Sequence, residues 1–230
     1  MCKNDDTRMS EKKEEEKERE NKIEEEEGPR EPRFPSRFPL FAGKCALQRA
    51  IRRYILTNGV DCPYGPMGTW DVSNITDMSE LFQGYTTFNE SLEAWDVSHV
   101  DNMSRMFAGC TSFNQPLQAW NVSNVGNMDS MFYGCRTFNQ PLNTWNVSNV
   151  VNIAQMFVDC RAFNQPLNTW NVSRVTDMNF MFYACPAYQH TLFAWTQQQN
   201  PHVLEQLDTL FSVEDQCTLC LQQRHDYLLK

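Results

Sequence analysis

The chain has 230 residues and a formal net charge of −9, which is room for one or two domains. It lacks the clustered basic face that nucleic-acid binding requires, so nucleic acid is disfavoured as a partner. No apolar run approaches the roughly 20 residues of a membrane span, and neither a small-molecule substrate site nor a cofactor site is evident.

Residues 1–39 are expected to form a disordered charged tail that ends in a proline-rich linker. The first 33 residues carry 13 acidic and 9 basic side chains. With almost nothing apolar to bury, such a segment cannot offset the entropy of ordering. It also lacks the apolar stretch of roughly 7–15 residues that a secretion signal needs. A reducing intracellular compartment is therefore favoured over secretion or the cell surface.

A helix is predicted over residues 44–58, inside an N-terminal helical cap of residues 40–69. Its apolar residues recur at the i, i+3, i+4 spacing of one helix face. Arg49, Arg52 and Arg53 lie on the other side, either as an interaction patch or, more simply, as a solvated face. A helix here would cover the apolar end of the repeats that follow.

Residues 70–195 repeat with a period of 25 residues, which indicates a repeat architecture. Each unit reads W-(N/D)-V-S-x-(V/I)-x-(D/N)-M-x-x-M-F-x-G-C-x-x-F-N-Q-P-L-x-x. The alternation in W-N-V-S-N-V predicts a short strand, and the spacing in M-x-x-M-F-x-G-C predicts a short helix. We therefore expect a solenoid of five 25-residue turns, with short parallel strands plus short helices and helical caps. The tryptophans that mark the period are Trp70, Trp95, Trp120, Trp145, Trp170 and Trp195.

Four cysteines occupy the same position in consecutive turns. Stacked at about the 4.8 Å spacing of neighbouring strands, their parallel side chains suit disulfide geometry poorly. A buried column of free thiols is expected instead. These cysteines are Cys110, Cys135, Cys160 and Cys185.

Residues 196–230 are expected to form a C-terminal cap, with a helix over residues 202–211. Cys217-x-x-Cys220, with His225 nearby, is a weak candidate for a zinc or redox site. A structural zinc site takes four ligands, so two cysteines on a terminal helix or tail are the simpler alternative.

The repeat resembles the bacterial surface protein repeat of BspA-like, leucine-rich-repeat-related surface proteins and Listeria-type lipoproteins. The matching motif is W-(D/N)-V-S-N-V-x-(D/N)-M-x-x-M-F-x-G-C-x-x-F-N-Q-P-L, as in residues 120–142, and the resemblance covers about residues 70–195. It implies a leucine-rich-repeat-like solenoid and a role in adhesion or other protein–protein binding. Bacterial members usually carry a signal peptide or lipobox, and this chain shows neither.

The sequence thus favours a non-enzymatic protein–protein interaction module, adhesin-like or a scaffold. A structural or assembly component, such as a virion or surface-layer protein, is the alternative, and a zinc- or redox-dependent protein centred on Cys217 and Cys220 is a third. Recognition should lie at the positions that differ between turns, because the constant positions build the fold. Residues 196–230 could instead fold back over part of this surface. The candidate partner-binding residues are Arg105, Tyr133, Val158, Phe180 and Tyr183.

Overall fold

The computed structural model describes residues 41–60, 62–206 and 209–211. The chain divides into two units, Met1–Arg37 and Phe38–Lys230, and all of the described residues belong to the second. The predicted tail, residues 1–39, lies outside them.

The N-terminal cap contains the helix predicted over residues 44–58. Helix α2 runs from Lys44 to Thr57 and buries Leu47, Ala50 and Ile51. It ends at Asn58, whose left-handed backbone lets the next amide bond back to Tyr54. A short 3-10 helix, η1 (Met67–Thr69), then leads into the first repeat.

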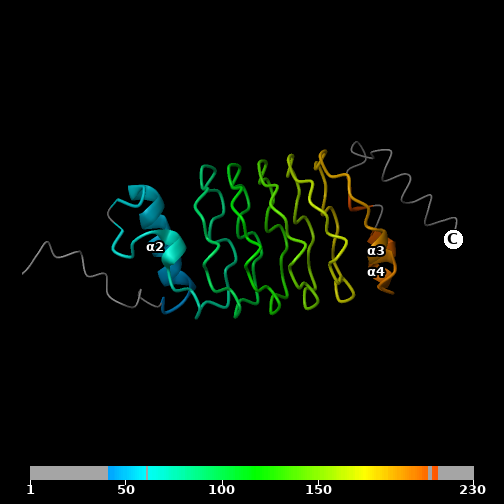
Figure 1. Cartoon of the computed structure of the whole chain (residues 1–230), viewed down its shortest axis with the longest axis horizontal. Coiled ribbons are helices and arrows are strands. Elements are labelled where there is room, and N and C mark those ends of the chain that lie inside the picture. Colours follow the sequence, from blue (N-terminus) through cyan, green and yellow to red (C-terminus); the bar gives the residue numbers. More distant parts are fainter. Residues whose placement is uncertain (1–40, 61, 207–208, 212–230) are drawn as a thin grey trace, which may run out of the picture. The chain divides into compact units, whose positions relative to one another are not determined.

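Successive repeats lie side by side as turns of similar path (Figure 1). Hydrogen bonds from four alternating amides in each turn join it to carbonyls of the next. In the first turn the amides of residues 78, 80, 82 and 84 donate to the carbonyls of residues 102, 104, 106 and 108, at 2.8–3.0 Å. The same pattern recurs at each later junction between repeats.

The predicted strand-based, leucine-rich-repeat-like solenoid is wrong. The described residues contain no β-strand, and the parallel pairing between turns is limited to isolated bridges such as Asp77 with Asn102. In a strand, the amides between those that bond to the following turn would bond to the turn on the other side, whereas those of Met106 and Ala108, for example, bond back to the carbonyls of Met103 and Arg105 in their own turn. The W-N-V-S-N-V segment is also not extended, because the amide of Val100, for example, bonds back to the carbonyl of Val97.

The short helix predicted within each turn is also absent from the described repeats. Two positions in each M-x-x-M-F-x-G-C segment have positive φ, which interrupts a right-handed helix. The second is the glycine or its replacement, and the first is never glycine. The residues at this first position have φ of 54–61° and are Glu80, Arg105, Ser130, Gln155 and Phe180.

The core consists of columns of identical side chains that run from turn to turn. Within a turn the two phenylalanines stack face to face, as Phe107 and Phe113 do with ring centroids 4.2 Å apart. Each indole N–H from the second repeat onward donates to a carbonyl 28 residues earlier, as from Trp120 to Leu92 at 2.9 Å. Since these donors and acceptors are buried, the tryptophan position couples packing to hydrogen bonding.

The helix of the C-terminal cap ends earlier than predicted. Helices α3 (Phe193–Thr196) and α4 (Pro201–Gln206) follow the last turn. The helix expected over residues 202–211 therefore ends at Gln206, residues 207–208 are outside the described set, and residue 209 is a 3-10 turn.

Candidate functional site

The variable positions of the repeat place three aromatic side chains on the surface. Tyr133 is 43 % exposed, and Phe180 and Tyr183 are each 45 % exposed. Val158, predicted as part of the same surface, is only 7 % exposed. The equivalent position of the second turn holds Ala108, which is also buried. Small side chains are therefore covered at this position of the repeat, whereas a tyrosine ring extends beyond its neighbours.

Phe180 and Tyr183 form an exposed edge-to-face pair in the last repeat. Their ring centroids are 6.2 Å apart at an interplanar angle of 82°, a favoured geometry for aromatic rings. The amide of Tyr183 donates to the carbonyl of Phe180 at 3.1 Å, which fixes the turn that carries both rings. The pair is therefore presented by a hydrogen-bonded backbone.

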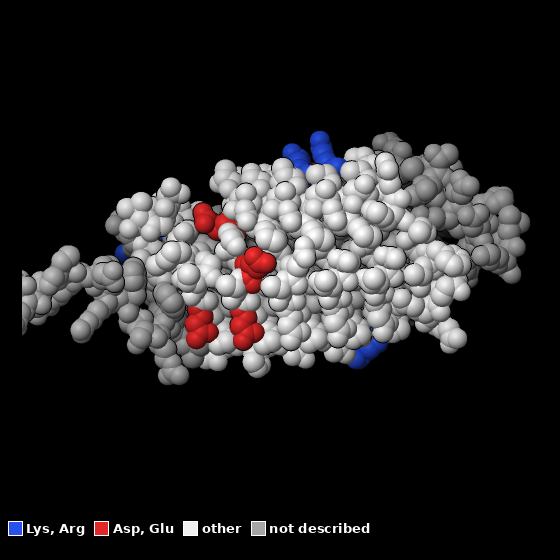
Figure 2. Space-filling model, in the orientation of Figure 1, with Lys and Arg blue, Asp and Glu red and all other residues white. Residues whose placement is uncertain are grey.

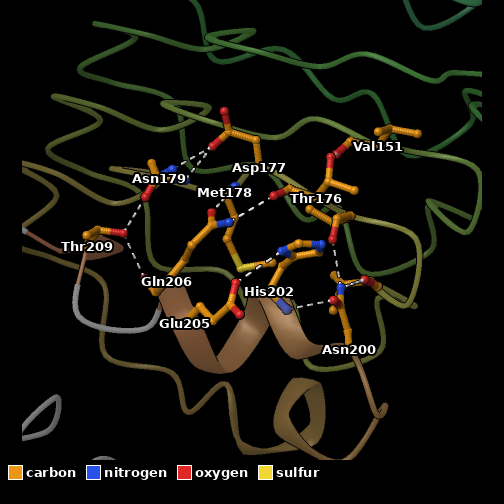
Figure 3. A network of polar contacts seen from close by, with 12 residues as sticks. Val151, Thr176, Asp177, Met178, Asn179, Asn200, His202, Glu205, Gln206 and Thr209 are labelled. Atoms are coloured by element: carbon orange, nitrogen blue, oxygen red, sulfur yellow. Dashed lines mark hydrogen bonds and ion pairs between the residues drawn. The ribbon is translucent and has the colours of Figure 1, made fainter.

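The C-terminal cap holds the backbone of this pair in place. The amide of Phe180 donates to the carbonyl of Thr209 at 2.8 Å, and the amide of Phe182 donates to that of Leu210. The Thr209 hydroxyl donates to Asn179 Oδ1 at 2.6 Å (Figure 3). Residues 209 and 210 thus take the place of a further turn.

Side-chain amides of the C-terminal cap also bond to backbone groups of the last turn, as the backbone of a further turn would. Gln206 accepts from the amide of Met178 and donates to the carbonyl of Thr176, both at 2.8 Å (Figure 3). Gln198 likewise accepts from the amide of Val172 and donates to the carbonyl of Trp170. A primary amide carries the donor and acceptor of a peptide group, so these residues satisfy backbone groups that would otherwise lose their partners. No periodic pattern in the sequence indicates this role.

Arg105 lies between carboxylates of neighbouring turns. Its guanidinium is 3.9 Å from Glu80 and 3.8 Å from Asp129, and its side chain is about half exposed. Ion pairs as long and exposed as these contribute little stability, so Arg105 presents its charge at the surface.

Sequence reasoning missed a cluster at Asp159, which stands where the first three turns have glycine. Its carboxylate accepts from Arg136 at 2.8 Å and from Arg161 at 2.7 Å. Burial opposes ionisation of Asp159, but the hydrogen bonds from the two arginines outweigh it and hold its pKa below the usual value. The change from glycine in the first three turns to aspartate in the fourth was the signal available.

The four cysteines of the column are buried thiols that form no disulfide with one another, as predicted. The thiol of Cys135 donates to the carbonyl of Phe107 at 3.1 Å, and Cys110 and Cys160 make the same contact one turn away. Burial raises the pKa of Cys110 to about 12 and that of Cys135 well above the ordinary value. These thiols are therefore protonated at neutral pH and are packing groups, not nucleophiles.

The weak candidates Cys217 and Cys220 lie outside the described residues. Within the part of the chain that the structure does describe, no three His, Cys, Asp or Glu side chains are grouped as metal ligands. No helix in that part is long and apolar enough to cross a membrane.

The stacked turns define a tandem-repeat protein. The chain belongs to the family described as "Mycoplasma protein of unknown function, DUF285", whose model matches residues 57–150 and again residues 118–217. The two matches together span residues 57–217, which include all of the repeats, the last residue of α2 and part of the C-terminal cap. No curated protein and no solved structure matches the chain.

Proposed function

We propose that the chain is a non-enzymatic protein–protein interaction module, related in its repeat to the BspA-like surface proteins. The observation that carries this proposal is the exposed ring pair of Phe180 and Tyr183, on a turn that buries its aromatic residues at the constant positions, Trp170, Phe182 and Tyr188. Tyrosine and arginine are enriched among residues that dominate binding energy. Tyr133 and Arg105, at the same two variable positions of earlier turns, extend the candidate surface.

The rigidity of this surface supports the same proposal. The ring pair is carried by backbone that bonds to the cap on one side and within its own turn on the other. Side chains held in this way lose less entropy on binding than those on an unanchored loop. The buried, constant columns can then be shared among repeats while the exposed positions select the partner.

A photo-crosslinking amino acid at position 183 tests the proposal. It is compared with the same group at Asn143, an exposed residue at another position of the repeat. We expect a protein crosslinked from position 183 in native extract and absent from position 143. Equal capture from both positions, or none from 183, contradicts the proposal.

The captured protein is then tested for binding to a double variant, Phe180→Asn with Tyr183→Ser. Asparagine tolerates the positive φ at position 180 better than other polar residues. The variant should weaken binding by roughly 100-fold or more, since two hot-spot residues are removed. The matched control is Asn143→Ser with Asn168→Ser, which should bind as the unaltered chain does.

A further inference from the structure

The outer face of α2 carries three arginines that have no acidic partner among residues 41–60, 62–206 and 209–211. Arg49, Arg52 and Arg53 are all exposed, and each ion pair within those ranges involves other residues. Their spacing of three and four residues places them together on one helix face. A concentrated positive charge thus remains uncompensated by the described part of the chain.

The two most exposed large apolar side chains of the described residues lie beside these arginines in sequence. Leu56 is 75 % exposed and Val60 is 81 % exposed. Leu56 follows Arg49 by seven residues and Arg52 by four, so it lies on the arginine face of α2. We call Arg49, Arg52, Arg53, Leu56 and Val60 the basic face. Its mixture of guanidinium groups and bare aliphatic side chains is typical of a surface that contacts a partner.

The first two repeats carry the complementary charge. Residues 70–119 contain seven acidic residues and one arginine, whereas residues 120–194 contain three of each sign. On the side drawn in Figure 2, the acidic side chains gather over the first turns. Five of the seven are exposed and make no ion pair within the described residues; we call them the acidic face, and they are Asp71, Glu90, Glu93, Asp96 and Asp101.

We propose that the basic face docks on the acidic face of a second copy of this chain. Both faces lie at the same end of the repeats, because α2 packs on the first turn through Tyr54 and Trp70, whose ring centroids are 5.7 Å apart. Lys44 at the start of α2 also bonds the carboxylate of Asp77 in that turn. A two-fold axis can therefore bring each basic face onto the other copy's acidic face, and the contact closes as a dimer.

A second copy fits this surface better than an anionic membrane. Arginines beside aliphatic side chains attract acidic lipid headgroups, but the exposed carboxylates of the acidic face lie at the same end and would be repelled by them. A second copy uses both charges at once. Because the charges are exposed, the association depends on ionic strength and weakens as the Debye length falls from about 10 Å at 0.1 M salt to about 3 Å at 1 M.

Sedimentation velocity of the full chain over a range of concentrations and salt tests this proposal. We expect a dimer at low salt that dissociates as salt rises. The variant Arg49→Gln/Arg52→Gln/Arg53→Gln should weaken dimerisation by roughly tenfold or more, as expected for three exposed ion pairs. The control Asn143→Asp/Asn168→Asp/Gln197→Glu lowers the net charge by the same three units at exposed positions and should dimerise normally.

A charge exchange makes the test specific. The variant Arg49→Glu/Arg52→Glu/Arg53→Glu and the variant Asp71→Lys/Glu93→Lys/Asp96→Lys should each remain monomeric alone and associate when mixed. Circular dichroism melts establish that each variant is folded. A monomer at every salt concentration, or equal weakening by the control, overturns the proposal. So does a chain that stays monomeric but binds phosphatidylserine vesicles through the three arginines. The variant Phe180→Asn/Tyr183→Ser should dimerise normally, so this proposal can fail without the proposed function failing.

Discussion

Replacing Gly134 with alanine should cost more stability than the same change at Gly126, although the two glycines are only eight residues apart. Gly134 has φ +72°, and a Cβ there would meet only Gly109, at an ordinary 3.7 Å. The cost is therefore conformational, about 1–2 kcal/mol for an L-residue in the left-handed region. Gly126 does not have positive φ, and its Cβ would lie 3.8 Å from the nearest carbonyl oxygen.

Both substitutions reduce the entropy of the unfolded chain to the same extent, so the difference between them isolates the backbone strain. Urea denaturation followed by tryptophan fluorescence should give Gly126→Ala at least the stability of the unaltered chain. Gly134→Ala should be about 1–2 kcal/mol below Gly126→Ala. Ala184 has φ 54° at the equivalent position of the last turn, so Ala184→Gly should relieve the same strain. Equal stabilities of Gly126→Ala and Gly134→Ala would refute the left-handed assignment.

Three further predictions concern the columns and the cap. Burial raises the pKa of the Cys135 thiol above the ordinary 9.0. Above about pH 9 this thiol therefore ionises in the unfolded chain before it ionises in the folded chain, so the stability that Cys135 contributes in full at lower pH is lost as the pH rises. Cys135→Ala should therefore reduce the alkaline loss of stability by about 1.4 kcal/mol per pH unit, and unchanged slopes in urea melts at stepped pH would contradict this. Gln206→Ala should cost about 1–3 kcal/mol because it strands two backbone groups. Gln197→Ala, at an exposed position of the same cap, is the control and should change stability by under about 0.5 kcal/mol. Trp120→Phe should cost about 2–4 kcal/mol in thermal melts, since it removes buried ring atoms and the indole N–H bond to the carbonyl of Leu92, which keeps only the amide of Trp95 as a donor; a loss below that of Gln197→Ala would refute the role of the indole.

The period and the buried columns were predictable because one residue type fills one site in every turn. Tryptophan, phenylalanine and cysteine recur every 25 residues because each of these side chains is buried at an equivalent place in every turn. The free thiols followed from this spacing, and α2 followed from an ordinary helical pattern with an Asn-Gly end.

The local conformation of each turn could not be predicted in the same way. Glu80, Arg105 and Phe180 have positive φ, although none of them belongs to the residue types that signal it. Apolar spacing therefore indicated a helix where the backbone amides in fact bond to the next turn. The W-N-V-S-N-V alternation indicated a strand, yet Asn121 accepts a hydrogen bond from the amide of Ser123 and forms a tight turn.

The candidate surface was only partly visible in the sequence. Positions that vary between turns pointed to Phe180 and Tyr183, which are exposed. They also pointed to Val158, which is buried because exposure at that position depends on side-chain length. The peptide-like role of Gln206 depends on three-dimensional placement alone and leaves no pattern in a single chain.

We propose that recognition resides in exposed rings on a backbone that the buried columns hold fixed. The most direct measurement is the affinity of the crosslinked partner for Phe180→Asn/Tyr183→Ser, with the melting temperature measured on the same samples. We expect a loss of affinity of roughly 100-fold with a melting temperature within about 4 °C of the unaltered chain. Unchanged affinity in a variant that melts normally would contradict it.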